Sequence, residues 1–119
     1  MAGFSLEQRD LAAGYCEISV AGELDLAVAD RLGRAIEAVG AGNVGLVVGL
    51  GGCEFIDSTG IAVILRARQR FETEGRRLVV CCPADQVERI LEITGLSQDG
   101  LVYETLGDAV EAMRSATDD

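Results

Sequence analysis

The chain has 119 residues, of which 49% are hydrophobic and 25% charged, a composition that is typical of one folded domain and that excludes a disordered chain. Its formal net charge of −10 argues against nucleic acid and anionic lipid as partners, because both bind through clustered Lys and Arg, and it suits a partner with a basic face. The absence of histidine excludes Ser-His-Asp and Cys-His catalysis and histidine-ligated metals. No apolar run approaches the roughly 18 residues of a membrane span, and the N-terminus lacks the basic-then-apolar layout of a signal peptide, so we expect a soluble, cytoplasmic protein.

The first part of the chain predicts a hairpin followed by a helix. Phe4–Leu6 and Tyr15–Val20 alternate apolar and polar residues, which is typical of strands, and the segment Asp10–Gly14 is a turn between them. Gly22–Asp25 is a short polar stretch that we expect to be a second turn. Apolar residues at helical spacing follow it, up to a stop at Gly40, and they are Val28, Leu32, Ala35, Ile36 and Val39.

A nearly continuous apolar run in the middle of the chain predicts the central strand. Val44–Leu50 suits a strand that is covered on at least one face, and Cys53–Ile56 resumes its apolar character. The polar turn Asp57–Gly60 follows, and after it apolar residues at helical spacing predict a long helix that ends at Gly75.

The last part of the chain repeats this alternation. Leu78–Cys82 is a second buried strand, and Pro83 opens a helix that stops at Gly95. Leu101–Tyr103 is a short strand, and a final helix begins at Leu106. The order is therefore ββαβαβαβα, which predicts an α/β fold with four helices, a mostly parallel central sheet and an antiparallel N-terminal edge hairpin. We expect a single domain over residues 1–119, with its core at about 4–115 and a frayed acidic tail at 116–119.

Four cysteines, Cys16, Cys53, Cys81 and Cys82, each lie in an apolar run, and none belongs to a Cys-x-x-Cys pair. This placement predicts buried, reduced thiols. Disulfides or a thiolate metal site are the alternatives that remain open.

The strand-to-helix junction Asp57-Ser58-Thr59-Gly60 is the main candidate for a functional site. Such a junction aims backbone N–H groups and the positive end of the helix dipole at one spot. Ser58 could be the N-cap of the helix, since serine is among the best capping residues, an acceptor of a phosphate, which would add about −1.5 to −2 charge, or both. An aspartic protease motif and a nucleophile elbow do not fit, because an extra residue interrupts the first and Ile56 replaces the first glycine of the second.

Two further groups of residues are candidates for acid–base catalysis or phosphate binding. Glu23 and Asp25 could form a carboxylate pair, but a solvated turn in which Asp25 caps or precedes the helix is favoured, because no nucleophile or metal ligand is nearby. The glycines Gly49, Gly51 and Gly52 lack the Gly-Lys-Ser/Thr of a phosphate-binding loop, which favours packing or bulge positions.

Several arginines follow the junction. A solvated helix face is favoured over a phosphate-binding cluster, because Arg66 and its neighbours lie two or more turns from the start of the helix. These arginines are Arg66, Arg68, Arg70, Arg76 and Arg77.

Taken together, three motifs resemble a STAS domain of the anti-sigma factor antagonist type, over about residues 4–115. They are Gly22-Glu23-Leu24-Asp25 before the first helix, Phe55-Ile56-Asp57-Ser58-Thr59-Gly60 before the second, and Leu91-Glu92-Ile93-Thr94-Gly95-Leu96 at the end of the third. The resemblance implies a protein that binds an anti-sigma factor and thereby frees a sigma factor for transcription.

The resemblance also implies partners and site residues. The anti-sigma factor would be a serine kinase with a histidine-kinase-like ATPase fold, which phosphorylates Ser58 and so ends binding, and a PP2C-type phosphatase would reset the protein. The protein would then have no catalytic residues, cofactor or metal of its own, and would be a monomer or a weak dimer. The alternative is a STAS interaction module without phosphorylation, in a stress-complex scaffold or as a regulatory subunit of a transporter. The implied partner-binding residues are Glu23, Leu24, Asp25, Asp57, Ser58, Thr59, Gly60 and Ile61.

Gly49 departs from the family pattern, since similar proteins often have an aspartate at this place in the central strand. If that carboxylate assists phosphate transfer, Gly49→Asp should raise the phosphorylation rate and still allow folding.

Overall fold

A computed structural model describes residues 3–40, 42–98 and 100–117. It contains one five-stranded sheet in the order β1-β2-β3-β4-β5, in which β1 and β2 are antiparallel and all other neighbours are parallel. The predicted α/β fold and its ββαβαβαβα order are confirmed. The strands are β1 (Ser5–Asp10), β2 (Tyr15–Leu24), β3 (Gly45–Ile56), β4 (Arg77–Cys81) and β5 (Val102–Tyr103), the helices are α1 (Ala29–Glu37), α2 (Ser58–Thr73), α3 (Asp85–Ile93) and α4 (Leu106–Thr117), and two short 3-10 helices span Ala12–Gly14 and Leu96–Gln98.

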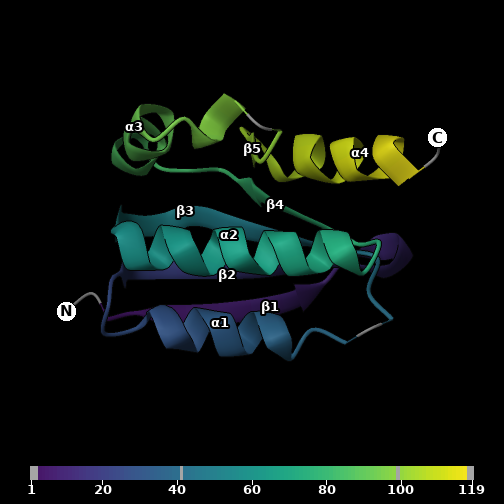
Figure 1. Cartoon of the computed structure of the whole chain (residues 1–119), viewed down its shortest axis with the longest axis horizontal. Coiled ribbons are helices and arrows are strands. Elements are labelled where there is room, and N and C mark those ends of the chain that lie inside the picture. Colours follow the sequence, from purple (N-terminus) through teal and green to yellow (C-terminus); the bar gives the residue numbers. More distant parts are fainter. Residues whose placement is uncertain (1–2, 41, 99, 118–119) are drawn as a thin grey trace.

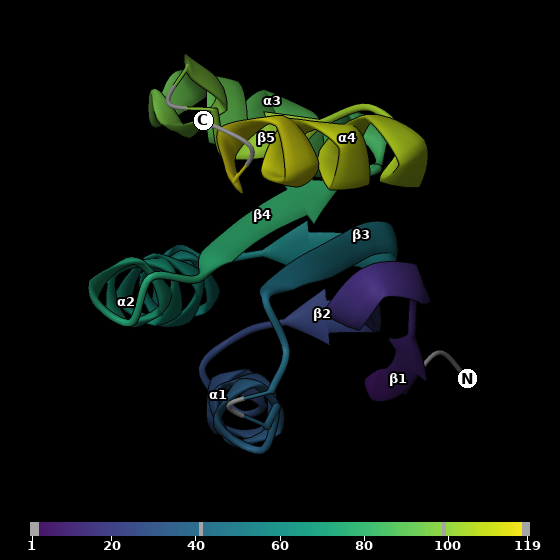
Figure 2. The ribbon, with the colours of Figure 1, turned by 90° about the vertical axis from the view of Figure 1, so that its right-hand side faces the viewer.

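The first half of the central strand β3, residues 45–50, is buried on both of its faces. Leu46 and Val48 belong to the larger apolar cluster, which joins the sheet to α1, α2 and α3. Val47, which points the other way, packs in a second cluster that includes Met113 of α4. Helices α1 and α2 lie side by side along the strands (Figure 1), on the same side of the strand layer (Figure 2). The continuous apolar run of the central strand therefore reflects cover from helices on both sides.

The polar stretch that was predicted as a turn before the first helix is mostly strand. Glu23 pairs with Phe55 and Leu24 pairs with Ile56, so β2 continues four residues beyond the predicted end. Gly22 has a φ of 94°, and the register shifts between Gly22 and Glu23. The prediction of a turn here was wrong because long-range pairing with the end of β3 overrides the local polarity.

Several element ends also differ from the sequence prediction. Helix α3 begins at Asp85, and Pro83 precedes it rather than opening it. Helix α4 continues through Thr117, and the last two residues of the predicted tail, 118 and 119, lie outside the described part of the chain. None of the helices within the described ranges is long and apolar enough to cross a membrane.

Candidate functional site

The ends of β2 and β3 bring two loops together. Because these strands are parallel and adjacent, the segment that follows Leu24 and the segment that follows Ile56 leave the sheet at the same edge. Loops at the carboxyl edge of a parallel sheet are the common location of binding sites in α/β folds. The junction Asp57–Gly60 and the predicted motif around Asp25 therefore form one corner of the molecule.

Asp57, and not Ser58, is the N-cap of α2. Its Oδ1 accepts hydrogen bonds from the backbone N–H of Thr59 at 2.9 Å and of Gly60 at 3.1 Å, and from the Thr59 hydroxyl. Ser58 is the first residue of the helix itself. The prediction of Ser58 as the cap was wrong, because aspartate caps as well as serine does and Asp57 has the extended backbone that a cap requires.

The second oxygen of the same carboxylate connects the two loops. Oδ2 of Asp57 accepts a hydrogen bond from the backbone N–H of Leu26 at 3.2 Å, and the backbone N–H of Asp57 donates to the carbonyl of Leu24 at 3.2 Å. The loop after β2 is further shaped by Asp25, whose Oδ1 accepts from the N–H of Ala27 at 3.0 Å. Asp25 thus forms a turn before α1, which agrees with the turn interpretation and not with a catalytic carboxylate pair.

The hydrogen bonds to Asp57 favour its charged form. The hydroxyl of Thr59, followed by the backbone N–H of Gly60, lowers the pKa of the Asp57 carboxyl below its ordinary value. Asp57 is therefore ionised at neutral pH and places a fixed negative charge next to Ser58.

Gly60 allows the helix to approach β2 closely. A Cβ atom at this position would lie 2.8 Å from Cγ of Leu24 and 2.9 Å from its carbonyl oxygen. Leu24 itself is fully buried. Only glycine permits this contact, so Gly60 and Leu24 together fix the start of α2 against the end of β2.

Ser58 is exposed, and its hydroxyl makes no hydrogen bond to any of the residues described. Two large apolar residues of the adjoining segments are also exposed: Leu26 at 76%, whose N–H donates to Asp57, and Phe55 at 43%, which precedes Asp57 by two residues. Leu26 was absent from the predicted site. It could have been recognised in the sequence as a large apolar residue in a polar loop, outside the apolar face of the helix that follows.

The predicted partner-binding residues fall into two groups by exposure. Glu23 and Ser58 are exposed, and Asp25, Asp57, Thr59 and Ile61 are partly exposed. Leu24 and Gly60 are buried, so these two residues support the exposed residues of the corner from within the fold.

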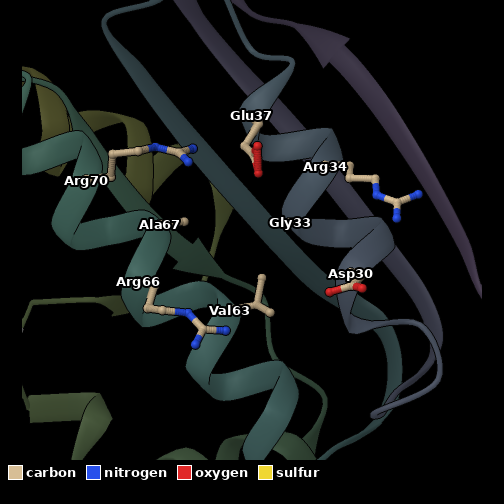
Figure 3. A pocket seen from close by; sticks show the side chains of 8 residues that line it. All are labelled: Asp30, Gly33, Arg34, Glu37, Val63, Arg66, Ala67 and Arg70. Atoms are coloured by element: carbon tan, nitrogen blue, oxygen red, sulfur yellow. The ribbon is translucent and has the colours of Figure 1, made fainter.

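The arginines that follow the junction do not gather at Ser58. Arg66 and Arg70 line one wall of a groove of about 490 Å³ between α2 and α1, and Asp30 and Glu37 line the other wall (Figure 3). Arg76 donates to the carbonyls of Asn43 and Gly40 and lies 4.0 Å from the centre of the Phe71 ring. This arrangement agrees with solvated and structural roles and not with a phosphate-binding cluster.

Gly49 faces away from the larger apolar cluster, toward Glu17 of the neighbouring strand. A Cβ atom at Gly49 would lie 3.0 Å from Oε2 of Glu17, which is buried and paired with Arg9 at 2.6 Å. An aspartate at this position would bring two carboxylates together. Gly49→Asp, which was expected to allow folding, should therefore fold with a loss of stability.

The thiols agree in large part with the sequence prediction. All four cysteines are free, and three of them are buried, whereas Cys82 is partly buried. Burial raises the pKa of the thiols of Cys16 and Cys53, which keeps them protonated and unreactive. Among the residues that the structure describes, no group of three or more Cys, Asp or Glu is placed to hold a metal ion.

This mostly parallel sheet, with an exposed serine at the junction of β3 and α2, has the architecture of a STAS domain. A model of the STAS domain family matches residues 5–109, and the chain belongs to that family. The resemblance seen in the sequence motifs is thereby confirmed.

Individual relatives are consistent with this assignment. The chain is 34% identical over 95 residues to an anti-sigma-B factor antagonist of Listeria monocytogenes, covering 78% of this chain and 82% of that protein. It is 28% identical over 102 residues to the anti-sigma-F factor antagonist RsfB of Mycobacterium tuberculosis, covering 85% and 83%. The crystal structure of an anti-sigma factor antagonist from Mycobacterium paratuberculosis matches with a TM-score of 0.82 and 30% identity, over 94% of this chain and 95% of that one.

Proposed function

We propose that this protein is an anti-sigma factor antagonist that binds an anti-sigma factor through the corner formed by the end of β2 and the start of α2. The observation that supports this most directly is an exposed serine, without a hydrogen-bond partner among the residues described, on a corner held rigid by Asp57. The names of the relatives point to the same activity. Binding would release a sigma factor in the cytoplasm, and the protein itself would catalyse no reaction.

The composition of the corner suits a protein partner. Leu26 and Phe55 offer exposed apolar area, which is the usual source of affinity at the centre of an interface. Glu23, Asp25 and Asp57 are acidic residues of the same corner, and the chain as a whole has a net charge of −10. A partner with a basic face would be attracted over long range and oriented by these carboxylates.

Phosphorylation of Ser58 would end the interaction. In this step the Ser58 hydroxyl oxygen attacks the γ-phosphorus of ATP held by the anti-sigma kinase, its proton passes to a base on the kinase, and ADP leaves. Thr59 is the poorer acceptor, because its hydroxyl already donates to Asp57. A PP2C-type phosphatase would hydrolyse the phosphoserine and restore binding.

Two backbone donors at the start of the helix are not available to an added phosphate. The N–H groups of Thr59 and Gly60 are already occupied by Asp57, so a phosphate of about −1.5 to −2 charge on Ser58 would lie beside a carboxylate. Repulsion between the two would weaken the Asp57 cap and its hydrogen bond to Leu26. The phosphate would thus change both the charge and the shape of the binding corner.

The test uses the cognate anti-sigma kinase with ATP, followed by mass spectrometry and a binding assay. Wild type and Thr59→Val should gain one phosphate on Ser58, and Ser58→Ala should gain none while still binding the kinase. Ser58→Asp should bind at least about tenfold more weakly, because it places a second carboxylate at the corner. Binding without any phosphate transfer would instead favour the constitutive STAS interaction module, and no binding to the kinase would refute the proposed function.

A further inference from the structure

The end of β4 brings two neighbouring thiols into contact. The Cys82 thiol donates to Sγ of Cys81, and the two sulfur atoms are 2.7 Å apart, not far beyond the covalent S–S bond of about 2.0 Å. Successive side chains of an extended strand point to opposite faces, which would keep these thiols apart. Here the backbone of Cys82 has a φ of 64°, and this left-handed conformation turns its side chain toward Cys81.

The conformation of Cys82 is unusual for its sequence. Residues other than glycine, asparagine and aspartate rarely adopt a positive φ, and a residue before proline, here Pro83, normally adopts an extended conformation. The surrounding structure holds it in place, because the N–H of Cys82 donates to the carbonyl of Tyr103 at 2.9 Å. Cys81 is anchored on its other side in the cluster that contains Val79 and Met113. Such an outlier, maintained by tertiary contacts, is a reason to look for a function.

We propose that Cys81 and Cys82 are a site of reversible thiol oxidation, at which a low-molecular-weight disulfide converts them into a vicinal disulfide. In the first step the Cys82 thiolate attacks one sulfur of the external disulfide, which forms a mixed disulfide on Cys82 and releases one thiolate. In the second step the Cys81 thiol loses its proton and its sulfur attacks Sγ of Cys82, which releases the second thiolate. Two protein thiols are oxidised, one external disulfide is reduced to two thiols, and excess external thiol reverses the reaction.

The burial of the two thiols assigns their roles. Cys82 is partly exposed, so it is the one that an external disulfide reaches. Cys81 is buried, and this burial, together with the hydrogen bond from Cys82, raises the pKa of the Cys81 thiol, so it is a poor first nucleophile. It can still resolve the mixed disulfide because its sulfur is already in contact with that of Cys82.

The pair lies outside the Ser58 corner but beside the strand that leads to it. Gly51 of β3 lies against the carbonyl of Cys82, since a Cβ there would be 3.6 Å from that oxygen. The other two thiols have different neighbours, the carbonyl of Glu17 for Cys16 and the carbonyl of Phe55 for Cys53. Oxidation of the pair would therefore be a chemical input separate from phosphorylation.

The positions of the arginines make the test direct. Trypsin cleaves after arginine, so the pair and each of the other two thiols end on separate peptides. Leu78–Arg89 contains both cysteines of the pair, Asp10–Arg31 contains Cys16, and Ala35–Arg66 contains Cys53. The folded protein is treated with glutathione disulfide, denatured in iodoacetamide and digested. We expect Leu78–Arg89 to be unlabelled and lighter than the reduced peptide by two hydrogen atoms, whereas the other two peptides carry the label. Recovery of Leu78–Arg89 with two labels, or as a lasting glutathione adduct, would overturn the proposal.

Two variants and an unfolded control test the roles of the thiols. Cys81→Ser should stop at the mixed disulfide on Cys82, and Cys82→Ser should leave Cys81 unmodified. The fold itself should matter: in concentrated urea, a larger share of wild-type chains should remain as the mixed disulfide, because the sulfur atoms are no longer held together. An equal share in urea and in buffer would show that the fold does not prepare the pair, and would also count against the proposal. Circular dichroism reports whether each variant folds. If a variant does not fold, the comparison of wild-type protein in buffer and in urea still tests the proposal.

Discussion

The carboxylate of Asp57 and the backbone N–H of Leu26 are 31 residues apart in the sequence and are joined by a hydrogen bond of 3.2 Å. The same carboxylate caps α2 through its other oxygen. One side chain thus sets both the position of Ser58 at the start of the helix and the position of Leu26 in the neighbouring loop. We therefore expect a change in charge at Ser58 to act on Asp57 first, and through it on the loop that contains Leu26.

Replacement of Asp57 should reveal this role in the pH dependence of stability. The pKa of Asp57 is lowered in the folded state, so its contribution is present above the unfolded pKa of about 3.9 and is lost as pH falls through the lower folded value. Asp57→Asn can still cap the helix but does not titrate. The difference in unfolding free energy between wild type and Asp57→Asn, from urea denaturation, should therefore shrink as pH falls from about 5 to about 3. A difference that stays constant over this range would contradict the assignment.

Ser58→Ala should have little effect on folding. Because Asp57 and not Ser58 caps the helix, the substitution removes no hydrogen bond among the residues described. We expect the free energy of unfolding to change by less than about 0.5 kcal/mol, which is usual for an exposed surface position. Urea denaturation of the two proteins at neutral pH measures this. A loss of about 1 kcal/mol or more would mean that Ser58 is a structural residue after all.

The alternation of strands and helices could be predicted from the sequence, because each element has a clear apolar period. The junction that we propose as the site could also be singled out from the sequence, since a polar Asp-Ser-Thr-Gly segment between two apolar elements stands out. Contacts between segments that are distant in the sequence could not be predicted. Whether Asp57 or Ser58 caps the helix depends on which residue is still extended, and this is set by the pairing of β3 with β2.

The dependence on contacts between distant segments also explains the other differences between the sequence prediction and the structure. Glu23 and Leu24 read as a polar turn locally, but they are strand because Phe55 and Ile56 pair with them. The contact between the thiols of Cys81 and Cys82 was hidden because an extended strand would separate them, and only the positive φ of Cys82 brings them together.

Two helix glycines should respond to alanine in opposite directions. Gly60→Ala would place a Cβ 2.8 Å from Cγ of Leu24 and 2.9 Å from its carbonyl, so we expect a loss of about 1–3 kcal/mol from overpacking. Gly33→Ala, in α1, would meet nothing closer than Val63 at 3.7 Å, an ordinary contact. It should stabilise the protein by about 0.5–1 kcal/mol, because alanine is the better helix former. Urea denaturation of both variants checks the pair, and stabilisation by Gly60→Ala would contradict the close approach.

Gly49→Asp should destabilise the protein through Glu17. The new carboxylate would lie next to a buried one, and we expect a loss of about 1–3 kcal/mol from crowding and like charge. The double variant Glu17→Gln with Gly49→Asp should recover part of this loss, because only one carboxylate remains. Denaturation of the two single variants and the double variant gives the coupling energy. Additive effects would show that the two positions do not interact.

Leu26→Asp should weaken binding to the anti-sigma factor and leave the fold intact. Leu26 is 76% exposed and contributes little to the core, so stability should change by less than about 0.5 kcal/mol. At the interface, however, a charge would replace apolar area beside Ser58, and we expect the dissociation constant to rise by about tenfold or more. Val44→Asp is the matched control, because Val44 is also exposed, at 45%, but precedes the first residue of β3, at the opposite end of that strand from Ser58. Isothermal titration calorimetry with the anti-sigma factor should detect weakened binding for Leu26→Asp alone. Equal weakening by both variants would mean that the contact surface is not confined to the corner that Asp57 holds together.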